Sequence, residues 1–152
     1  MNHTETDGLF RSAAYALGAV MTQKDNEYHL AIEDLEVLLS VDRQNDDDAI
    51  HCYVNLGRPA ADERAAVCEQ LLELNIEGDP FLNVAYAFDT HSGRAIFRAR
   101  LPDPDELDGD YLAFLIERFI EQTSHARGIV GDACSSMPIG NSDHLLKVAA
   151  LA

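Results

Sequence analysis

The sequence predicts an α+β domain in which an antiparallel twisted sheet is flanked by three helices, in the order α-β-β-β-α-β-β-α. Three observations support this fold class. Apolar residues recur with helical spacing in three segments, they alternate with polar residues in two pairs of neighbouring segments, and a short polar loop joins each pair. Strands joined by short loops pair antiparallel, and 152 residues suffice for one domain with its own core.

The first helix is expected over residues 6–21, with Thr6 or Asp7 as its N-cap. An apolar stripe follows the helical period, and further apolar residues widen it. The stripe consists of Leu9, Ala13, Ala16, Leu17 and Val20, with Phe10, Ala14 and Met21 beside it. Most of such a stripe packs into a core, and its width leaves part of it for a partner.

A short strand is expected over residues 27–32, followed by a hairpin of strands 35–41 and 49–56. Apolar and polar side chains alternate along both hairpin strands, so each strand has an inward and an outward face. The inward residues are Leu35, Val37, Leu39 and Val41 in the first strand and Ile50, Cys52, Val54 and Leu56 in the second. The residues GRP at 57–59 end the second strand.

The loop of this hairpin carries a run of acidic residues, Asp42, Asp46, Asp47 and Asp48. A calcium loop of the EF-hand type needs glycine at its sixth position and a bidentate glutamate at its twelfth. Neither register, starting from Asp42 or from Asp46, provides both residues, and no predicted helix flanks the loop. Aspartate and asparagine also suit turns, because their side chains bond to nearby backbone groups. The run is therefore interpreted as a solvated hairpin loop.

A second helix is expected over residues 62–76, with Asp62 as its cap and Glu63 placed favourably for the helix dipole. Its apolar residues form two neighbouring stripes. One consists of Ala65, Cys68, Leu71, Leu72 and Asn75, and the other of Val67, Leu71 and Leu74. A small residue such as Cys68 on a helical stripe is usually a buried hydrophobe.

A second hairpin is expected from strands 81–88 and 94–101, with Gly93 in the left-handed conformation at its turn. Three of the 11 basic residues, Arg94, Arg98 and Arg100, lie on one face of the later strand. Cross-strand ion pairing and protection of a sheet edge are the favoured explanation. An anion-binding site is the alternative.

The third helix is expected from Asp110 to about His125. Its apolar stripe consists of Tyr111, Leu112, Leu115, Ile116, Phe119 and Ile120, with Phe114 beside it. A Gly- and Ser-rich stretch follows, so residues 128–152 are expected to be a flexible tail with one short helical turn near residues 145–151. Residues 1–127 are expected to form the domain.

The chain is strongly acidic, with a net charge of −16 from 27 acidic and 11 basic residues. This charge argues against nucleic acid and anionic membranes as partners, because both require clustered basic residues. No apolar run is long enough to predict membrane insertion, and no signal peptide is apparent. The three cysteines, Cys52, Cys68 and Cys134, form no CxxC pair, which favours reduced thiols in a cytoplasm.

Sequence motifs for chemistry are absent. The chain has no GxxxxGK[ST], GxGxxG or GxSxG motif, and its six histidines show no metal-binding spacing. His51 and Cys52 are adjacent on a predicted strand, so their side chains point to opposite faces and cannot share a metal. We therefore expect no catalysis, no cofactor and no metal. A compact domain with apolar stripes suits binding of an extended segment at a sheet edge or in a helix groove.

The succession of elements resembles the class I chaperones of bacterial type III secretion, the Tir-chaperone family, over about residues 8–127. The resemblance rests on a hairpin that ends in a Gly–Pro break (56–59), the helix VCEQLLELN, the turn D-x-x-S-G-R (89–94), the residues RLP (100–102) and the helix LAFLIERFIEQ. This sequence departs from the family pattern in two respects. The connection EGDP after the second helix is shorter than in many members, and the tail after residue 127 is longer than the shared core needs.

The resemblance implies a bacterial cytoplasmic homodimer that serves virulence. Such a chaperone binds the N-terminal region of a secreted effector, keeps it soluble and partly unfolded, and delivers it to the secretion ATPase, without nucleotide, metal or catalysis. By position in the family order, the effector-binding residues would be Phe10, Ala14, Leu17, Met21, Leu30, Ile32, Leu35 and Val37. The dimer interface would contain Val67, Leu71, Leu74, Ile96 and Arg98.

Two other functions compete with this interpretation. The first is a bacterial regulatory or sensory binding domain that has the same fold but no role in secretion. The second is a small hydrolase or metal enzyme that would use Cys68 or the aspartates of residues 46–48. The arginine face at Arg94, Arg98 and Arg100 would meet acidic residues of the effector or of the other subunit.

Overall fold

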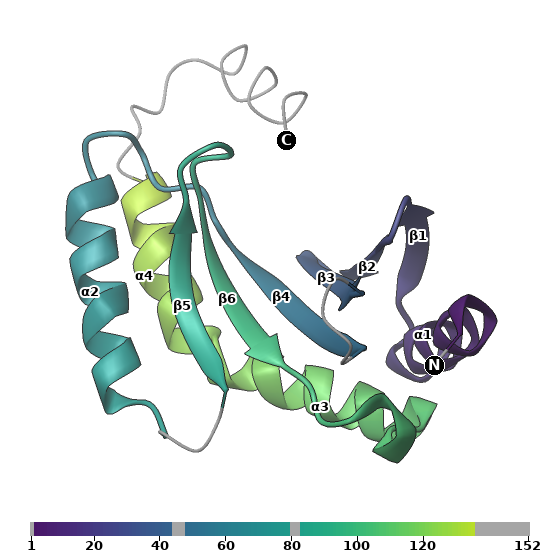
Figure 1. The fold of residues 1–152 in the computed structure, drawn as a ribbon. Coiled ribbons are helices and arrows are strands. Elements are labelled where there is room, and N and C mark those ends of the chain that lie inside the picture. Colours follow the sequence, from purple (N-terminus) through teal and green to yellow (C-terminus); the bar gives the residue numbers. More distant parts are fainter. Residues whose placement is uncertain (1, 44–47, 80–82, 136–152) are drawn as a thin grey trace, which may run out of the picture.

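The computed structural model describes residues 2–43, 48–79 and 83–135 (Figure 1). The helices are α1 (His3–Leu17), α2 (Arg64–Glu77), α3 (Gly109–Gln122) and α4 (Ser124–Ser135), with a short 3₁₀ helix at Pro104–Glu106. The strands are β1 (Val20–Lys24), β2 (Glu27–Ile32), β3 (Leu35–Asp42), β4 (Ala49–Gly57), β5 (Val84–Asp89) and β6 (Arg94–Arg100). The α+β class is confirmed, with one strand and one helix more than the sequence predicts.

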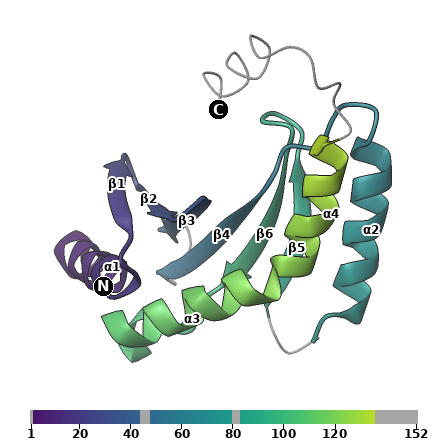
Figure 2. The same ribbon diagram turned by 180° about the vertical axis from the view of Figure 1, so that it is seen from behind.

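The six strands form one antiparallel sheet in the order β1-β2-β3-β4-β6-β5. Helices α1, α3 and α4 pack on one face of the sheet, and α2 lies beside the edge strand β5 (Figures 1 and 2). The opposite face carries no helix among the described residues. The two faces therefore have different environments, and this difference positions the candidate site.

The core lies between the sheet and the helices. Phe97 of β6 is fully buried, with its ring centroid 5.2 Å from that of Tyr86 in β5 and 5.7 Å from that of Phe119 in α3. At the other end of the sheet, Phe10 of α1 packs edge-to-face on Tyr28 of β2 at 4.7 Å. The inward residues predicted for β4 are buried as expected, namely Ile50, Cys52, Val54 and Leu56.

The first helix begins and ends earlier than the expected span of residues 6–21. Asn2 is its N-cap, in a capping box with Glu5, instead of Thr6 or Asp7. Gly18 ends the helix in the left-handed conformation (φ 64°), which glycine adopts without steric cost. The next residues form β1, whose Val20 pairs with Ala31 of β2. The expected helical positions of Val20 and Met21 are therefore wrong.

Helix α2 also differs in detail from the prediction. Its N-cap is Glu63, without a side-chain cap bond, instead of Asp62. The Asn75 side chain accepts a hydrogen bond from the backbone N–H of Tyr86 (2.7 Å) and donates one to its carbonyl (3.0 Å). These bonds satisfy backbone groups on the outer side of the edge strand β5. The first predicted residues of this strand, 81–82, lie outside the described residues.

The predicted third helix is divided into two. Helix α3 ends at Gln122, and α4 continues to Ser135. The expected flexible tail is wrong for residues 128–135, because an apolar stripe of α4, namely Ala126, Val130 and Ala133, is buried against the domain. The Cys134 thiol also donates a hydrogen bond to the carbonyl of Arg58 (2.6 Å). The rest of the predicted tail, residues 136–152, lies outside the described residues.

Candidate polypeptide-binding face

The helix-free side of the sheet, here called the open face, is formed by the outward side chains of all six strands. Antiparallel pairing places His29 beside Leu38, Leu38 beside Tyr53, and Tyr53 beside Arg98. A row of side chains thus crosses β2, β3, β4 and β6. The neighbouring residues of the open face are Val20, Thr22 and Lys24 (β1), Glu27 and Ala31 (β2), Glu36 and Ser40 (β3), His51 and Asn55 (β4), Arg94, Ile96 and Arg100 (β6), and Ala85, Ala87 and Asp89 (β5).

The open face contains two neighbouring hollows. One, of about 390 Å³, has an apolar floor from Leu38, Tyr53 and Ile96. The other, of about 370 Å³, extends across β2 to Val20 of β1. His29 and Glu36 line both, so the two hollows adjoin and are here together called the depression. Most of its surface is apolar, and charged side chains stand where the hollows meet.

The charged groups on the β2–β3 side of this depression are paired with one another. His29 lies with Nδ1 3.3 Å from a carboxylate oxygen of Glu36 and Nε2 3.7 Å from one of Glu27. Arg94 also contacts Glu36, at 3.8 Å. The expectation of cross-strand pairing on the arginine face is therefore confirmed for Arg94. The expected protection of a sheet edge is wrong, because β6 lies between β4 and β5.

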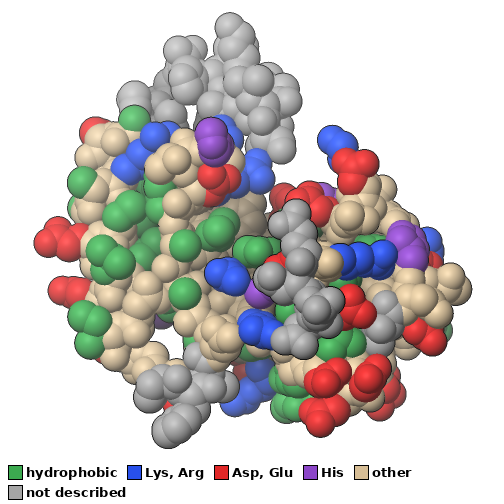
Figure 3. Space-filling view, viewed as in Figure 1, with side chains coloured by type: hydrophobic (Ala, Val, Ile, Leu, Met, Phe, Trp, Pro, Cys, Tyr) green, Lys and Arg blue, Asp and Glu red, His purple; other side chains and the backbone are tan. Residues whose placement is uncertain are grey.

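The other two arginines of β6 have a different environment. Arg98 and Arg100 are exposed, and no carboxylate among the described residues lies within ion-pair distance of either. His51 stands opposite Arg100 in the register, is 7% exposed, and has its Nδ1 buried without a hydrogen-bond partner. Burial and the charge of Arg98 lower the pKa of this imidazole, so it is neutral at pH 7. In Figure 3, basic side chains (blue) stand near the middle of the open face.

The eight predicted effector-binding residues lie close together, but mostly on the helix-covered side. Phe10, Ala14, Leu30 and Val37 are buried in the core between α1 and the sheet. Leu17, Met21, Ile32 and Leu35 are half-buried. In this conformation, the four half-buried residues expose surface that a partner can contact, whereas the four buried residues do not. The binding role of all eight residues stays a prediction.

The predicted interface residues are not brought together. Val67 and Leu71 are buried within the chain, Leu74 is half-buried beside them, and Ile96 and Arg98 lie on the open face. Of the large exposed apolar residues of α2, Leu72 belongs to the other stripe and is 62% exposed, and Ile76, one turn further along, is 84% exposed. Sequence periodicity revealed both stripes of α2 but not which one faces solvent. The dimer interface stays a prediction.

The edge at β1 was missed by the sequence analysis. Within the described ranges, β1 pairs only with β2, so its other side is a sheet edge. Val20 at its start is 69% exposed, and Tyr15 at the end of α1 is 92% exposed. The β-branched residues Val20 and Thr22 just after Gly18 are the local signal that favours a strand here.

The described residues contain no group of three or more His, Cys, Asp or Glu side chains that could hold a metal ion. The aspartates proposed for the rival metal site fall partly in residues 44–47, which lie outside the described ranges. All three cysteines are free, and burial raises the pKa of the Cys52 thiol to about 12. None of the described helices is long and apolar enough to cross a bilayer.

The fold is shared with chains of two solved complexes from Pseudomonas aeruginosa. A chain of the ExoT–SpcS complex matches 82% of this chain over 98% of its own length, with a TM-score of 0.53 and 16% identity. A chain of the heterodimeric ExoU–SpcU complex, from the type III secretion system, matches 80% of this chain over 97% of its own length, with a TM-score of 0.53 and 23% identity. No curated protein matches the sequence.

These likenesses define the class of fold, a small α+β domain with an antiparallel sheet. The model of the Tir chaperone protein (CesT) family matches residues 12–127. The chain therefore belongs to the Tir chaperone protein family, and its class is that of the type III secretion chaperones. The resemblance noted in the sequence is confirmed.

Proposed function

We propose that the protein is a cytoplasmic chaperone that binds the N-terminal region of a type III secreted effector. It keeps this region soluble and partly unfolded and delivers it to the secretion ATPase for export. The observation that supports this function most strongly is the open face, because a sheet surface without a covering helix offers an apolar depression to a partner. Family membership supports the identity of the partner.

The bound segment is extended: one part adds as a strand beside the β1 edge, and another part crosses the open face along the row from His29 to Arg98. Backbone groups of an edge strand hydrogen-bond to an added strand, and alternate side chains then fill pockets on the sheet surface. The half-buried residues Leu17, Met21, Ile32 and Leu35 flank this end of the sheet and supply further apolar contact. Binding adds no catalytic step, metal or cofactor.

The chaperone acts as a homodimer that pairs through exposed residues of α2, and not through Ile96 and Arg98 of the predicted interface, which lie on the open face. Leu72 and Ile76 are one helical turn apart and expose most of their apolar surface, which a second subunit would bury. Replacing both with glutamate should convert the dimer to a monomer in light scattering, whereas replacing Glu69 and Glu73 with glutamine should not. A dimer that survives the first change would place the interface elsewhere.

The test of function is co-expression with the N-terminal region of the secreted protein encoded nearby, followed by size-exclusion chromatography with light scattering. The proposal predicts a chaperone dimer that carries one copy of that region. A lone chaperone that ignores the segment contradicts it. The alternative, a regulatory domain of the same fold, predicts the second result.

A further inference from the structure

We propose that Arg98 and Arg100, the arginine pair, bind an acidic side chain of the exported polypeptide where it crosses the open face. This inference rests on the proposed function and adds the chemistry of the partner. It predicts that the bound segment carries aspartate or glutamate beside its apolar residues.

The first argument is that no nearby carboxylate among the described residues neutralises the charges of the arginine pair. Acidic residues outnumber basic ones by 27 to 11, yet no described carboxylate lies within ion-pair distance of the arginine pair. Among the described residues, three other arginines have such a partner: Arg11 meets Asp7, Arg94 meets Glu36 on the same strand face, and Arg118 meets Glu121. Two like charges two residues apart on one strand face repel each other, and a carboxylate between them removes this cost.

The second argument is the surroundings of the pair. Tyr53 lies beside Arg98, and Leu38 lies beside Tyr53, so apolar surface adjoins the charge. His51, opposite Arg100, keeps a buried Nδ1 without a partner. A guanidinium binds a carboxylate through two parallel hydrogen bonds, which fixes geometry as well as charge. The site thus fits a carboxylate on a segment that also has apolar side chains.

The third argument concerns the direction of the segment. Neighbouring strands are about 4.8 Å apart, so Leu38 and Arg98, two strands apart, lie roughly 10 Å apart along the row. An extended chain advances about 3.4 Å per residue. An apolar residue over Leu38 would therefore stand about three residues from the acidic residue over the arginine pair. This spacing is a searchable feature of the partner.

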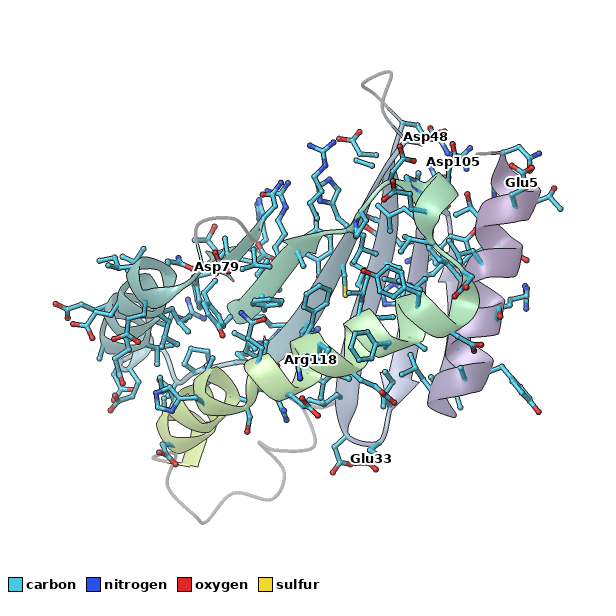
Figure 4. All side chains as sticks on the ribbon, turned by 90° about the horizontal axis from the view of Figure 1, so that it is seen from below. Glu5, Glu33, Asp48, Asp79, Asp105 and Arg118 are labelled. Carbon is cyan, nitrogen blue, oxygen red and sulfur yellow. The ribbon has the colours of Figure 1, made fainter. Side chains whose placement is uncertain are left out.

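The test uses two synthetic peptides with the same apolar residues. One peptide has an aspartate three residues from an apolar residue, as proposed, and the other has an asparagine at that position. Fluorescence anisotropy measures their affinity for the full chain. The aspartate peptide should bind about tenfold more tightly, and the R98Q/R100Q variant should lose this preference. The control R118Q removes another exposed arginine, from α3 (Figure 4), and this variant should still prefer the aspartate peptide. Equal affinities, or a preference that survives R98Q/R100Q, would overturn the proposal.

Co-purification of the effector's N-terminal region with the same variants separates this proposal from the proposed function. If wild type and R98Q/R100Q retain the region equally, the chaperone function stands and the arginine proposal fails. If wild type ignores the region but prefers the aspartate peptide through the pair, the arginine site stands and the proposed function fails. Equal melting temperatures of the variants would confirm that both substitutions leave the fold intact.

Discussion

The two faces of strand β6 show how one segment serves both the fold and the surface. Ala95, Phe97 and Ala99 point toward the helices and are fully buried, whereas Arg98 and Arg100 point to the open face and are exposed. Alternation along the strand separates these environments by a single residue. The helix-covered face therefore determines stability, and the open face is available for binding.

The largest effect should come from removing the central ring of the covered face. Phe97→Ala would lose contacts with Tyr86 and Phe119 and leave a cavity, which should lower the free energy of unfolding by about 3–5 kcal/mol. The matched change on the open face, Ile96→Ala, should cost about 1 kcal/mol, because that side chain is only half-buried. Urea denaturation measures both. Equal losses would mean that the open face is also part of the core.

The junction of α1 and α3 on the covered face gives the next effect. A Cβ on Gly109 would collide with the Ser12 side chain, so Gly109→Ala should destabilise the domain by about 1–3 kcal/mol. Gly128→Ala is the control, because a Cβ there meets nothing within 4 Å and alanine favours a helix. Thermal unfolding should separate the two variants. An unchanged melting temperature for Gly109→Ala would show that the helices can move apart freely.

A smaller loss of stability is expected at the β5 edge. Asn75→Ala removes both hydrogen bonds to the Tyr86 backbone, which should cost about 1–2 kcal/mol and speed amide exchange at Tyr86. Gln70→Ala removes only an exposed bond to the carbonyl of Ala66 and serves as the control. If exchange at Tyr86 stayed slow in Asn75→Ala, another group would have to protect this edge.

The smallest effect concerns pH and the open face. Because the pKa of His51 is lowered in the fold, its protonation opposes folding. Its contribution to stability is therefore complete above the unfolded pKa of about 6.5 and decreases as the pH falls from there toward the folded pKa. His51→Gln should flatten the stability profile below pH 6.5. Parallel profiles for wild type and His51→Gln would contradict this account.

Local patterns explain why much of the fold could be predicted. Period-2 alternation identified β3, β4 and β6, because each has a buried and an open face. The helix-to-strand change at Gly18 was missed, because Val20 and Met21 continue the helical spacing of α1, and pairing with β2 decides their conformation. Helix α4 was missed because its Gly- and Ser-rich sequence has weak helix propensity and depends on the burial of Ala126 and Val130.

The candidate site was harder to predict than the fold. Alternation identified the arginine face. Among the described residues, however, Arg94 has a carboxylate partner and Arg98 has none, a difference that depends on the register with β3 and β2. The family order assigned binding to core residues such as Phe10 and Leu30, because an apolar residue in the sequence does not show whether a helix of the same chain already covers it.

The most direct test of the central claim, that the open face and the β1 edge bind the effector, is hydrogen–deuterium exchange on the chaperone with and without the effector's N-terminal region. The account predicts that amides of Val20–Lys24 gain protection on binding while those of α3 and α4 keep their rates. Protection confined to the helix-covered side, with β1 unchanged, would contradict it.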